Sequence, residues 1–156
     1  MQDSRQHGST LIPSFRYRDA HAAIEFLERA LGFTRHAVYP GENNTVQHAE
    51  LRHGSGMIML GSASNPSPHP HLMAHPQDIG SRVTSPVYLV VPDCDPVWER
   101  AKAAGAEILM ELKSMDYGGR AFAIRDPEGY HWSVGEYDPW QALEPATGSQ
   151  SASNSA

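Results

Sequence analysis

The residues with the clearest chemical potential are a histidine and a carboxylate in the segment "TVQHAELR", where His48 and Glu50 stand two positions apart. Alternate residues of a β-strand point to the same face, so both side chains should share one face of a sheet. Glu50 is the candidate general base if the fold buries it, and His48 is the second catalytic candidate. Two other interpretations stay open. Glu50 binds a cationic group or pairs with Arg16, and His48 is an ordinary hydrogen-bonded strand histidine.

Other polar and sulfur-containing side chains show the same two-residue spacing. These pairs are Ser14 with Arg16, Met57 with Met59, and His131 with Ser133. Arg120 follows two glycines, where a backbone can approach a ligand closely, so it is a candidate anion contact; a surface ion pair is the equal alternative. Trp140 follows the last predicted strand and should either cover the mouth of a pocket or pack on a partner subunit.

A further group of histidines, His69, His71 and His75, stands in "HPHLMAH". Three imidazoles can form a zinc site. Prolines separate these histidines and no carboxylate adjoins them, so the segment is interpreted as a surface loop without a biological metal site.

Composition narrows the classes of function. The chain has 156 residues, a formal charge of −6 and no cluster of lysines and arginines, which disfavours binding to nucleic acid. The acidic balance would tolerate a neutral or cationic ligand. Cys94 is the single cysteine, so no internal disulfide can form. With no apolar run of membrane-spanning length and no signal-like start, we expect a cytoplasmic protein that does not bind membranes.

The elements that must position these residues occur twice. A helix should run from Asp19, an N-cap, to Gly32, and a second from the pair Asp95 and Pro96 to Gly105. The interval from Gly32 to Gly56 equals that from Gly105 to Gly129. Each half also carries one strand before its helix and three after it. The pattern predicts an α+β fold of two βαβββ units that form a curved mixed sheet around one pocket.

The predicted domain organisation follows from this repeat and from changes in composition. A Pro-, Ser- and His-rich stretch separates the halves, and the end of the chain is rich in Ser, Ala, Thr and Asn. We predict a flexible N-terminus at 1–10, a single domain at 11–142 and a disordered tail at 143–156. Within the domain, a first unit at 11–61 is joined to a second unit at 86–137 by a linker loop at 62–85.

The closing segment "RDPEGYHWSVGEY" and the helical segment "YRDAHAAIEFLERALGF" resemble those of the glyoxalase, bleomycin-resistance and dioxygenase superfamily, also called vicinal oxygen chelate proteins. "AELRHGSGMIMLG" and "RAKAAGAEI" are most similar to its PhnB-like, glyoxalase-like branch. The resemblance implies that the paired strand residues face a common pocket. It also implies a homodimer. The ligand-binding candidates are then Ser14, Arg16, Met57, Met59, Tyr88, Arg120, His131, Ser133 and Trp140.

The resemblance also says where a divalent metal would be held. The family's ligand positions match Ile12, Met59, Pro86 and Ser133 in this sequence. Two of these side chains have no donor, and a thioether and a hydroxyl are poor ligands for a hard or borderline ion. We therefore predict no metal at these positions and no cofactor.

Two main hypotheses about function follow. The first is a small-molecule-binding protein of the bleomycin-resistance type without the usual metal, taking a planar or cationic ligand by stacking and cation–π contact. The second is a glyoxalase-like lyase, isomerase or related enzyme. It would use a divalent metal on His48, Glu50 and His131, or metal-free acid/base chemistry at Glu50. An interaction protein with a vestigial pocket is a third interpretation.

Overall fold

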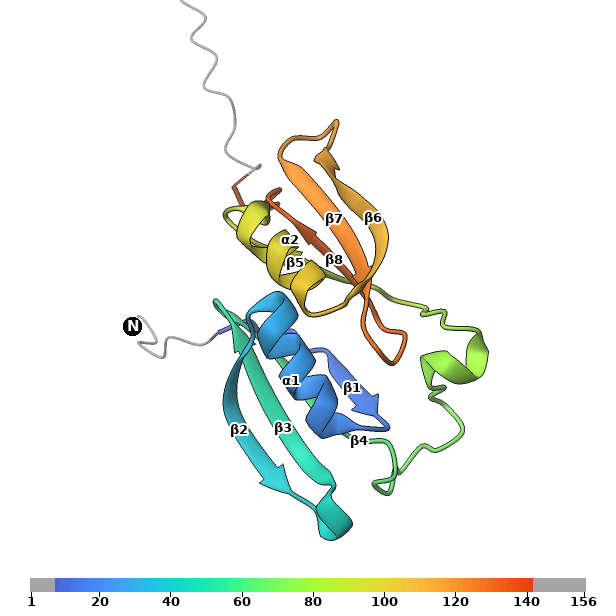
Figure 1. Cartoon of the computed structure of the whole chain (residues 1–156). Coiled ribbons are helices and arrows are strands. Elements are labelled where there is room, and N and C mark those ends of the chain that lie inside the picture. Colours follow the sequence, from blue (N-terminus) through green and yellow to red (C-terminus); the bar gives the residue numbers. More distant parts are fainter. Residues whose placement is uncertain (1–7, 142–156) are drawn as a thin grey trace, which may run out of the picture.

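The chain folds into two units of the same topology, joined by a long linker (Figure 1). The computed structural model describes residues 8–141, so the start of the predicted N-terminal segment and the tail at 143–156 lie outside the described residues. The elements are β1 (Ser14–Tyr17), α1 (Ala20–Leu31), β2 (Thr34–Pro40), η1 (Glu42–Asn44), β3 (Val46–His53), β4 (Gly56–Ser62), η2 (Pro76–Ile79), β5 (Val87–Val90), α2 (Cys94–Ala103), β6 (Glu107–Ser114), β7 (Arg120–Arg125) and β8 (His131–Gly135).

Each unit contains one mixed sheet, and the strand order is equivalent in the two. The first four-stranded sheet has the order β1-β4-β3-β2, and the second has the order β5-β8-β7-β6. The first strand of each unit pairs in parallel with the last, and the other pairs are antiparallel. The predicted α+β fold of two βαβββ units is confirmed, with the mixed sheet present as two separate sheets.

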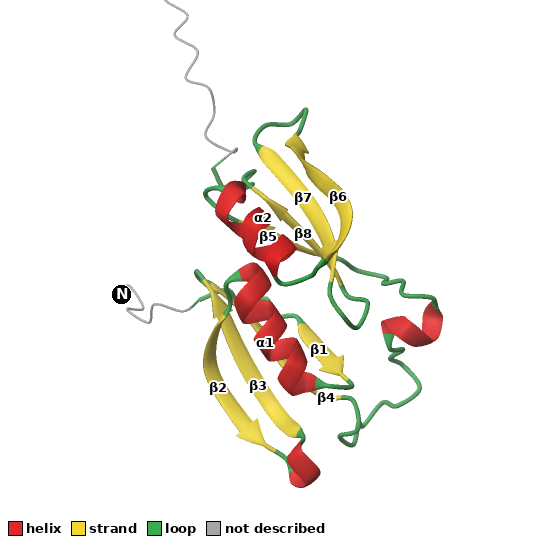
Figure 2. Cartoon of the chain, viewed as in Figure 1, coloured by secondary structure: helices red, strands yellow, loops and turns green. Residues whose placement is uncertain are grey.

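Helix α1 forms where its capping residues and its apolar spacing predict it. The Asp19 side chain accepts a hydrogen bond from the Ala22 N–H at 3.0 Å, and Gly32 ends the helix in the left-handed conformation at φ 80°. Its buried face includes Ile24 and Leu27. This face covers the first sheet, and α2 covers the second (Figure 2).

The two units share a core instead of folding apart. Helices α1 and α2 lie against each other, and Arg100 of α2 donates to the carbonyl oxygens of Glu28 and Arg29 at the end of α1, at 2.7 and 3.1 Å. The buried ring of Trp132 on β8 stacks on Phe15 of β1, with 5.3 Å between ring centroids. The helix-covered faces of the sheets therefore meet within one chain, and the opposite faces stay open.

The predicted equivalence of glycines holds for one pair only. Gly32 and Gly105 both follow a helix with positive φ, at 80° and 74°. Gly56 and Gly129 are not equivalent, because Gly56 is already the first residue of β4 and Gly129 precedes β8 in a turn at φ 99°. In the first unit the positive φ belongs to Gly54, at 56°. The β3–β4 connection is a shorter turn than the β7–β8 connection. The equal sequence intervals from Gly32 to Gly56 and from Gly105 to Gly129 therefore do not correspond to equivalent turns.

Residues 8–141 contain no helix that is both long and apolar enough to cross a membrane.

Candidate functional site

The His48 and Glu50 pair lies on the open face of the first sheet, as the strand alternation predicts. His48 Nε2 lies 3.1 Å from Glu50 Oε1, and His36 Nε2 of β2 lies 3.8 Å from Glu50 Oε2. The ring of Tyr39 stacks on that of His48 with centroids 6.0 Å apart. Side-chain exposure is 27% for Glu50 and 38% for His48. This imidazole and carboxylate are close enough to share a hydrogen bond, and they lie at a partly solvated surface.

Arg16 does not pair with Glu50, which corrects one of the alternatives. Its Nη2 donates to the carbonyl oxygens of Ser62 and Ala63, at 3.5 and 3.0 Å, and to that of Asn65. Strand β4 lies between the strands that carry these two residues. Arg16 of β1 is paired with Gly61 of β4, whereas Glu50 of β3 is paired with Met59 of β4. The offset along β4 and the width of that strand hold the two side chains apart.

The second sheet carries a weaker polar pair on its open face. Ser133 Oγ lies 3.4 Å from His131 Nε2. Burial lowers the pKa of His131 below its ordinary value, and the charge of Arg125 lowers it further, so the imidazole stays neutral at physiological pH. Tyr88, on β5 opposite Ser133, donates its hydroxyl to the Tyr137 carbonyl oxygen at 3.0 Å.

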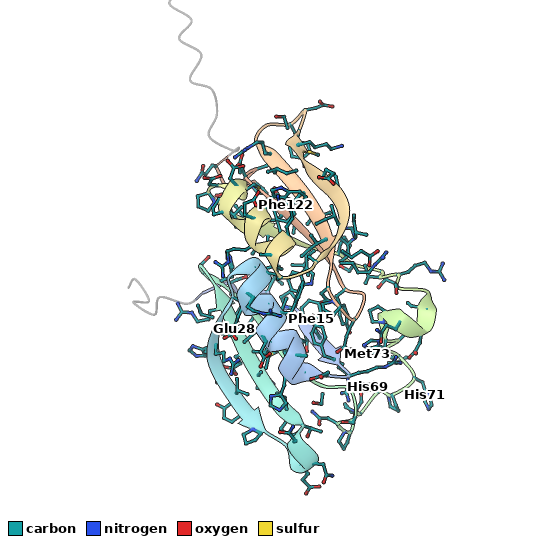
Figure 3. The ribbon with its side chains drawn as sticks, viewed as in Figure 1. Phe15, Glu28, His69, His71, Met73 and Phe122 are labelled. Atoms are coloured by element: carbon teal, nitrogen blue, oxygen red, sulfur yellow. The ribbon has the colours of Figure 1, made fainter. Side chains whose placement is uncertain are left out.

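Two adjoining hollows lie beneath the linker segment, residues 63–86. One cavity of about 530 Å³ is walled by β1 and the first half of the segment, and another of about 640 Å³ by β1, β5 and the second half. The two adjoin at Met73, Ala74 and Tyr130, and together they are called the linker groove below. Figure 3 places Met73 and His69 on the side of the segment that faces the first unit, with His71 farther out.

The linker groove collects some of the predicted ligand-binding residues and leaves others elsewhere. Arg16 lines the first cavity, and Ser14 and Tyr88 line the second. His48, Glu50, Met59, His131 and Ser133 line neither cavity. Met57 lines a separate hollow beside Ile12, His36 and Arg52.

Two other candidates do not line the groove. Arg120 bonds to Asp95 at 2.7 Å, to Glu136 at 2.9 Å and to Asp93 at 3.1 Å, around the start of α2. Of the two alternatives for Arg120, an anion contact for a ligand and a surface ion pair, the structure shows the ion pair. Trp140 is 87% exposed and lines neither of the two cavities, so packing on a partner subunit stays a prediction.

The linker segment is anchored by a buried pair of side chains. His75 Nε2 lies 2.8 Å from Glu128 Oε1, and these side chains are only 9% and 12% exposed. Glu128 also accepts the N–H groups of Arg18 and Asp19 just before α1, at 2.6 and 2.9 Å. The interpretation of all three linker histidines as surface residues is wrong for His75, because its partner is distant in sequence.

The turn that carries Glu128, residues 126–129, also contributes a buried aspartate that contacts both units. Asp126 Oδ2 accepts the Tyr17 hydroxyl at 2.7 Å and the Trp132 indole N–H at 3.2 Å, and Asp126 is 3% exposed. Burial raises the pKa of Asp126 above its ordinary value, and these bonds oppose the shift. Asp126 joins the two units through its bond to Tyr17.

Sequence reasoning missed the apolar wall of the groove. Tyr130 lines both cavities, and its hydroxyl donates to the Arg16 carbonyl oxygen at 2.8 Å. Leu72, Met73 and Ile79 come from the linker segment, where no periodic pattern marked them. The one sequence feature that could have indicated this wall is the presence of apolar residues in an otherwise polar loop.

The positions where the family holds a metal carry unsuitable side chains in this chain. Met59 and Ser133 face the open sides of their sheets, opposite Ser14 and Tyr88, and Ile12 and Pro86 precede those two partners by two residues. A set with one thioether, one hydroxyl and two hydrocarbon side chains does not fit a divalent metal. Within residues 8–141 no group of three or more His, Cys, Asp or Glu side chains is arranged to hold a metal ion, and this includes the set of His48, Glu50 and His131.

Comparison with known proteins agrees with this architecture. The family model described as the Glyoxalase/Bleomycin resistance protein/Dioxygenase superfamily matches residues 12–134. Uncharacterized protein Mb0911c of Mycobacterium bovis is 30% identical over 126 residues, which cover 81% of this chain and 82% of that protein.

Solved structures share the fold. TioX from Micromonospora sp. ML1 has a TM-score of 0.63 and 26% identity, covering 84% of this chain and all of its own. The fosfomycin resistance protein FosX from Mesorhizobium loti has a TM-score of 0.59 and 13% identity, covering 86% of this chain and 97% of its own, which shows the fold alone. With the family model spanning both βαβββ units, the chain belongs to the glyoxalase/bleomycin resistance protein/dioxygenase superfamily.

Proposed function

We propose that the chain is a small-molecule-binding protein that works without the divalent metal of its enzymatic relatives. The observation that carries this proposal is the linker groove. Its cavities, of about 530 and 640 Å³, have the size of ligand sites, and their walls are mainly apolar with a few placed polar groups. The donor set at Ile12, Met59, Pro86 and Ser133 supports the same conclusion from chemistry.

The test combines metal content with a search for retained ligand. Protein purified without a histidine tag should contain less than about 0.1 equivalent of zinc, nickel, manganese or iron by mass spectrometry. Native mass spectrometry should reveal an organic ligand, or thermal melting against a ligand library should find one. Stoichiometric metal bound with high affinity would contradict the proposal.

Methionine methyl NMR then locates the ligand. Met73 lines both cavities of the groove, and Met59 lies on the open face of the first sheet outside them. A bound ligand should shift the Met73 methyl resonance and leave that of Met59 in place. A shift at Met59 alone would move the site to the open face.

The second candidate function is an enzyme that uses acid/base chemistry, and the His48–Glu50 contact at 3.1 Å favours it. Glu50→Gln keeps the size of the side chain and removes its basicity. In an enzyme this variant should lose at least about tenfold in turnover of the identified ligand, since general-base catalysis contributes roughly a hundredfold or more. In the binding protein the ligand-induced rise in melting temperature should be unchanged.

A homodimer is part of the proposal. The open faces and edges of the sheets expose large side chains, including Tyr39, Tyr88, Val90 and Leu109. Such edges and faces are commonly covered by a second copy. Light scattering at micromolar concentration should give twice the chain mass of 17.1 kDa, and a monomer would contradict it. Membership of the PhnB-like branch and a cytoplasmic location stay predictions.

A further inference from the structure

The guanidinium of Arg16 has no carboxylate partner although it is half-buried in a cavity wall. Its Nη2 is used by the carbonyl oxygens of Ser62, Ala63 and Asn65, which hold the start of the linker segment. Within residues 8–141 its Nε and Nη1 have no hydrogen-bond acceptor, and no carboxylate lies within ion-pair distance. A guanidinium in this position keeps its charge and offers N–H donors to the cavity.

The charged side chains around the linker groove are mostly cationic. Arg16 and Arg18 line the first cavity and Arg82 lines the second, against one acidic lining residue, Asp78. That aspartate is already bonded to Arg18 at 2.5 Å. The groove is therefore electropositive in a chain whose formal charge is −6.

Beside these charges and polar lining residues such as Asn65, Ser67 and His69, the groove has an apolar and aromatic surface. Tyr130 stands between the cavities with its ring edge-on to Phe15, 5.1 Å between centroids, and Leu72, Met73 and Ile79 lie along the second cavity. A ligand that fills both parts needs an anionic group at one end and a hydrocarbon body at the other.

We infer that the linker groove binds amphipathic organic carboxylates, with the carboxylate against the Arg16 guanidinium and an apolar or aromatic body packed on Met73 and Tyr130. The inference rests on the proposed small-molecule binding and specifies its ligand class. Charge-assisted hydrogen bonds from arginine to carboxylate are stronger than neutral ones, and a ligand body packed on Met73 and Tyr130 would shield them from water.

A pair of probes that differ in one group tests the charge without altering the protein. 2-Naphthoate and 2-naphthamide share a body, and only the first carries a negative charge. The full chain should bind 2-naphthoate about tenfold or more tightly than the amide by calorimetry, with a shift of the Met73 methyl resonance. Equal affinities would overturn the inference and leave small-molecule binding intact. Absence of 2-naphthoate binding up to about 1 mM would also overturn it, and the search for retained ligand would then judge the proposed function separately.

Variants assign the preference to one residue. Arg16→Gln should make the two affinities equal, and Arg16→Lys should keep a preference for the acid because it keeps the charge. Arg52→Gln removes the same charge from the first sheet outside the linker groove and is the matched control, which should leave the preference unchanged. A preference that survives Arg16→Gln in folded protein, or one lost in Arg52→Gln, would overturn the assignment to Arg16.

Discussion

Glu128→Gln should both destabilise the fold and release the linker segment. The Glu128 carboxylate bonds to the backbone just before α1 and to His75 of the linker segment, so one substitution weakens both contacts. Its Oε1 bonds to the Arg18 N–H and to His75, and its Oε2 accepts the Asp19 N–H. Glutamine keeps one acceptor oxygen and turns the other into an N–H₂ group. In the orientation that keeps His75, this group faces the Asp19 N–H, donor against donor.

The structure sets the size of the effect. One hydrogen bond to a charged acceptor is lost, at about 1.5–3 kcal/mol. The favourable interaction of a negative charge with the N-terminus of α1 is lost as well, at about 0.3–1 kcal/mol. A total of about 2–4 kcal/mol corresponds to a fall in melting temperature of roughly 5–15 °C for a chain of this length.

A matched control separates the linker from the helix. Glu136 occupies the corresponding place at α2, where Oε1 accepts the Cys94 N–H at 3.0 Å and Oε2 accepts the Arg120 N–H at 2.9 Å. Glu136→Gln should also lower the melting temperature. In hydrogen exchange followed by mass spectrometry, peptides from 69–82 should exchange about tenfold or more faster in Glu128→Gln than in wild type, and at the wild-type rate in Glu136→Gln. Equal exchange of these peptides in both variants, or a melting temperature of Glu128→Gln within a degree of wild type, would refute the anchoring role.

Two further predictions concern buried groups. Tyr17→Phe removes a bond to the Asp126 carboxylate and should cost about 1.5–3 kcal/mol in urea unfolding at pH 7, against about 0.5–1.5 for Tyr130→Phe, which removes a bond to a neutral carbonyl. Because burial raises the folded-state pKa of Asp126, the folded protein takes up this proton first as pH falls, so the Tyr17→Phe deficit should shrink toward pH 4; a deficit independent of pH would contradict this. Burial, with the nearby charge of Glu136, raises the pKa of Cys94 to about 11, so the native thiol should stay unlabelled by a disulfide reagent at pH 8 and react on unfolding. Rapid labelling of native protein would contradict that placement.

The features that the sequence predicted are those fixed by local chemistry. Asp19 caps α1 because an aspartate before an apolar helical pattern can accept an N–H of the first turn. Gly32 caps α1, and Gly105 follows the Ala104 cap of α2, because positive φ costs glycine least. His48 and Glu50 share one face of β3 because alternate strand residues point to the same side.

The features that the sequence could not predict depend on the register between strands and on contacts between residues far apart in the sequence. Arg16 and Glu50 share the open face of the first sheet, but they face Gly61 and Met59 of the intervening strand, two residues apart along β4. With strands about 4.8 Å apart, their backbones are separated by two strand spacings as well as by this offset. Arg16 instead meets the carbonyl groups that begin the linker, and no pattern within the sequence announces that contact.

The linker groove was hidden for the same reason. A segment rich in Pro, Ser and His has no hydrophobic period, so it predicts a loop but not what the loop covers. The buried pairing of His75 with Glu128, which lies between β7 and β8, decides where the segment lies.

The net charge of the chain differs in sign from the charged side chains that line the linker groove. The acidic excess of the chain suggested a neutral or cationic ligand, yet many of its carboxylates already have partners. Arg120 alone engages three of them, and Arg35 is bonded to Glu28 at 2.9 Å. Carboxylates satisfied in this way contribute little field at a distant cavity, since ion pairs screen one another and salt screens what remains. Arg16 has no such partner within the described residues, so we expect its guanidinium to influence the choice of ligand more than the net charge of the chain does.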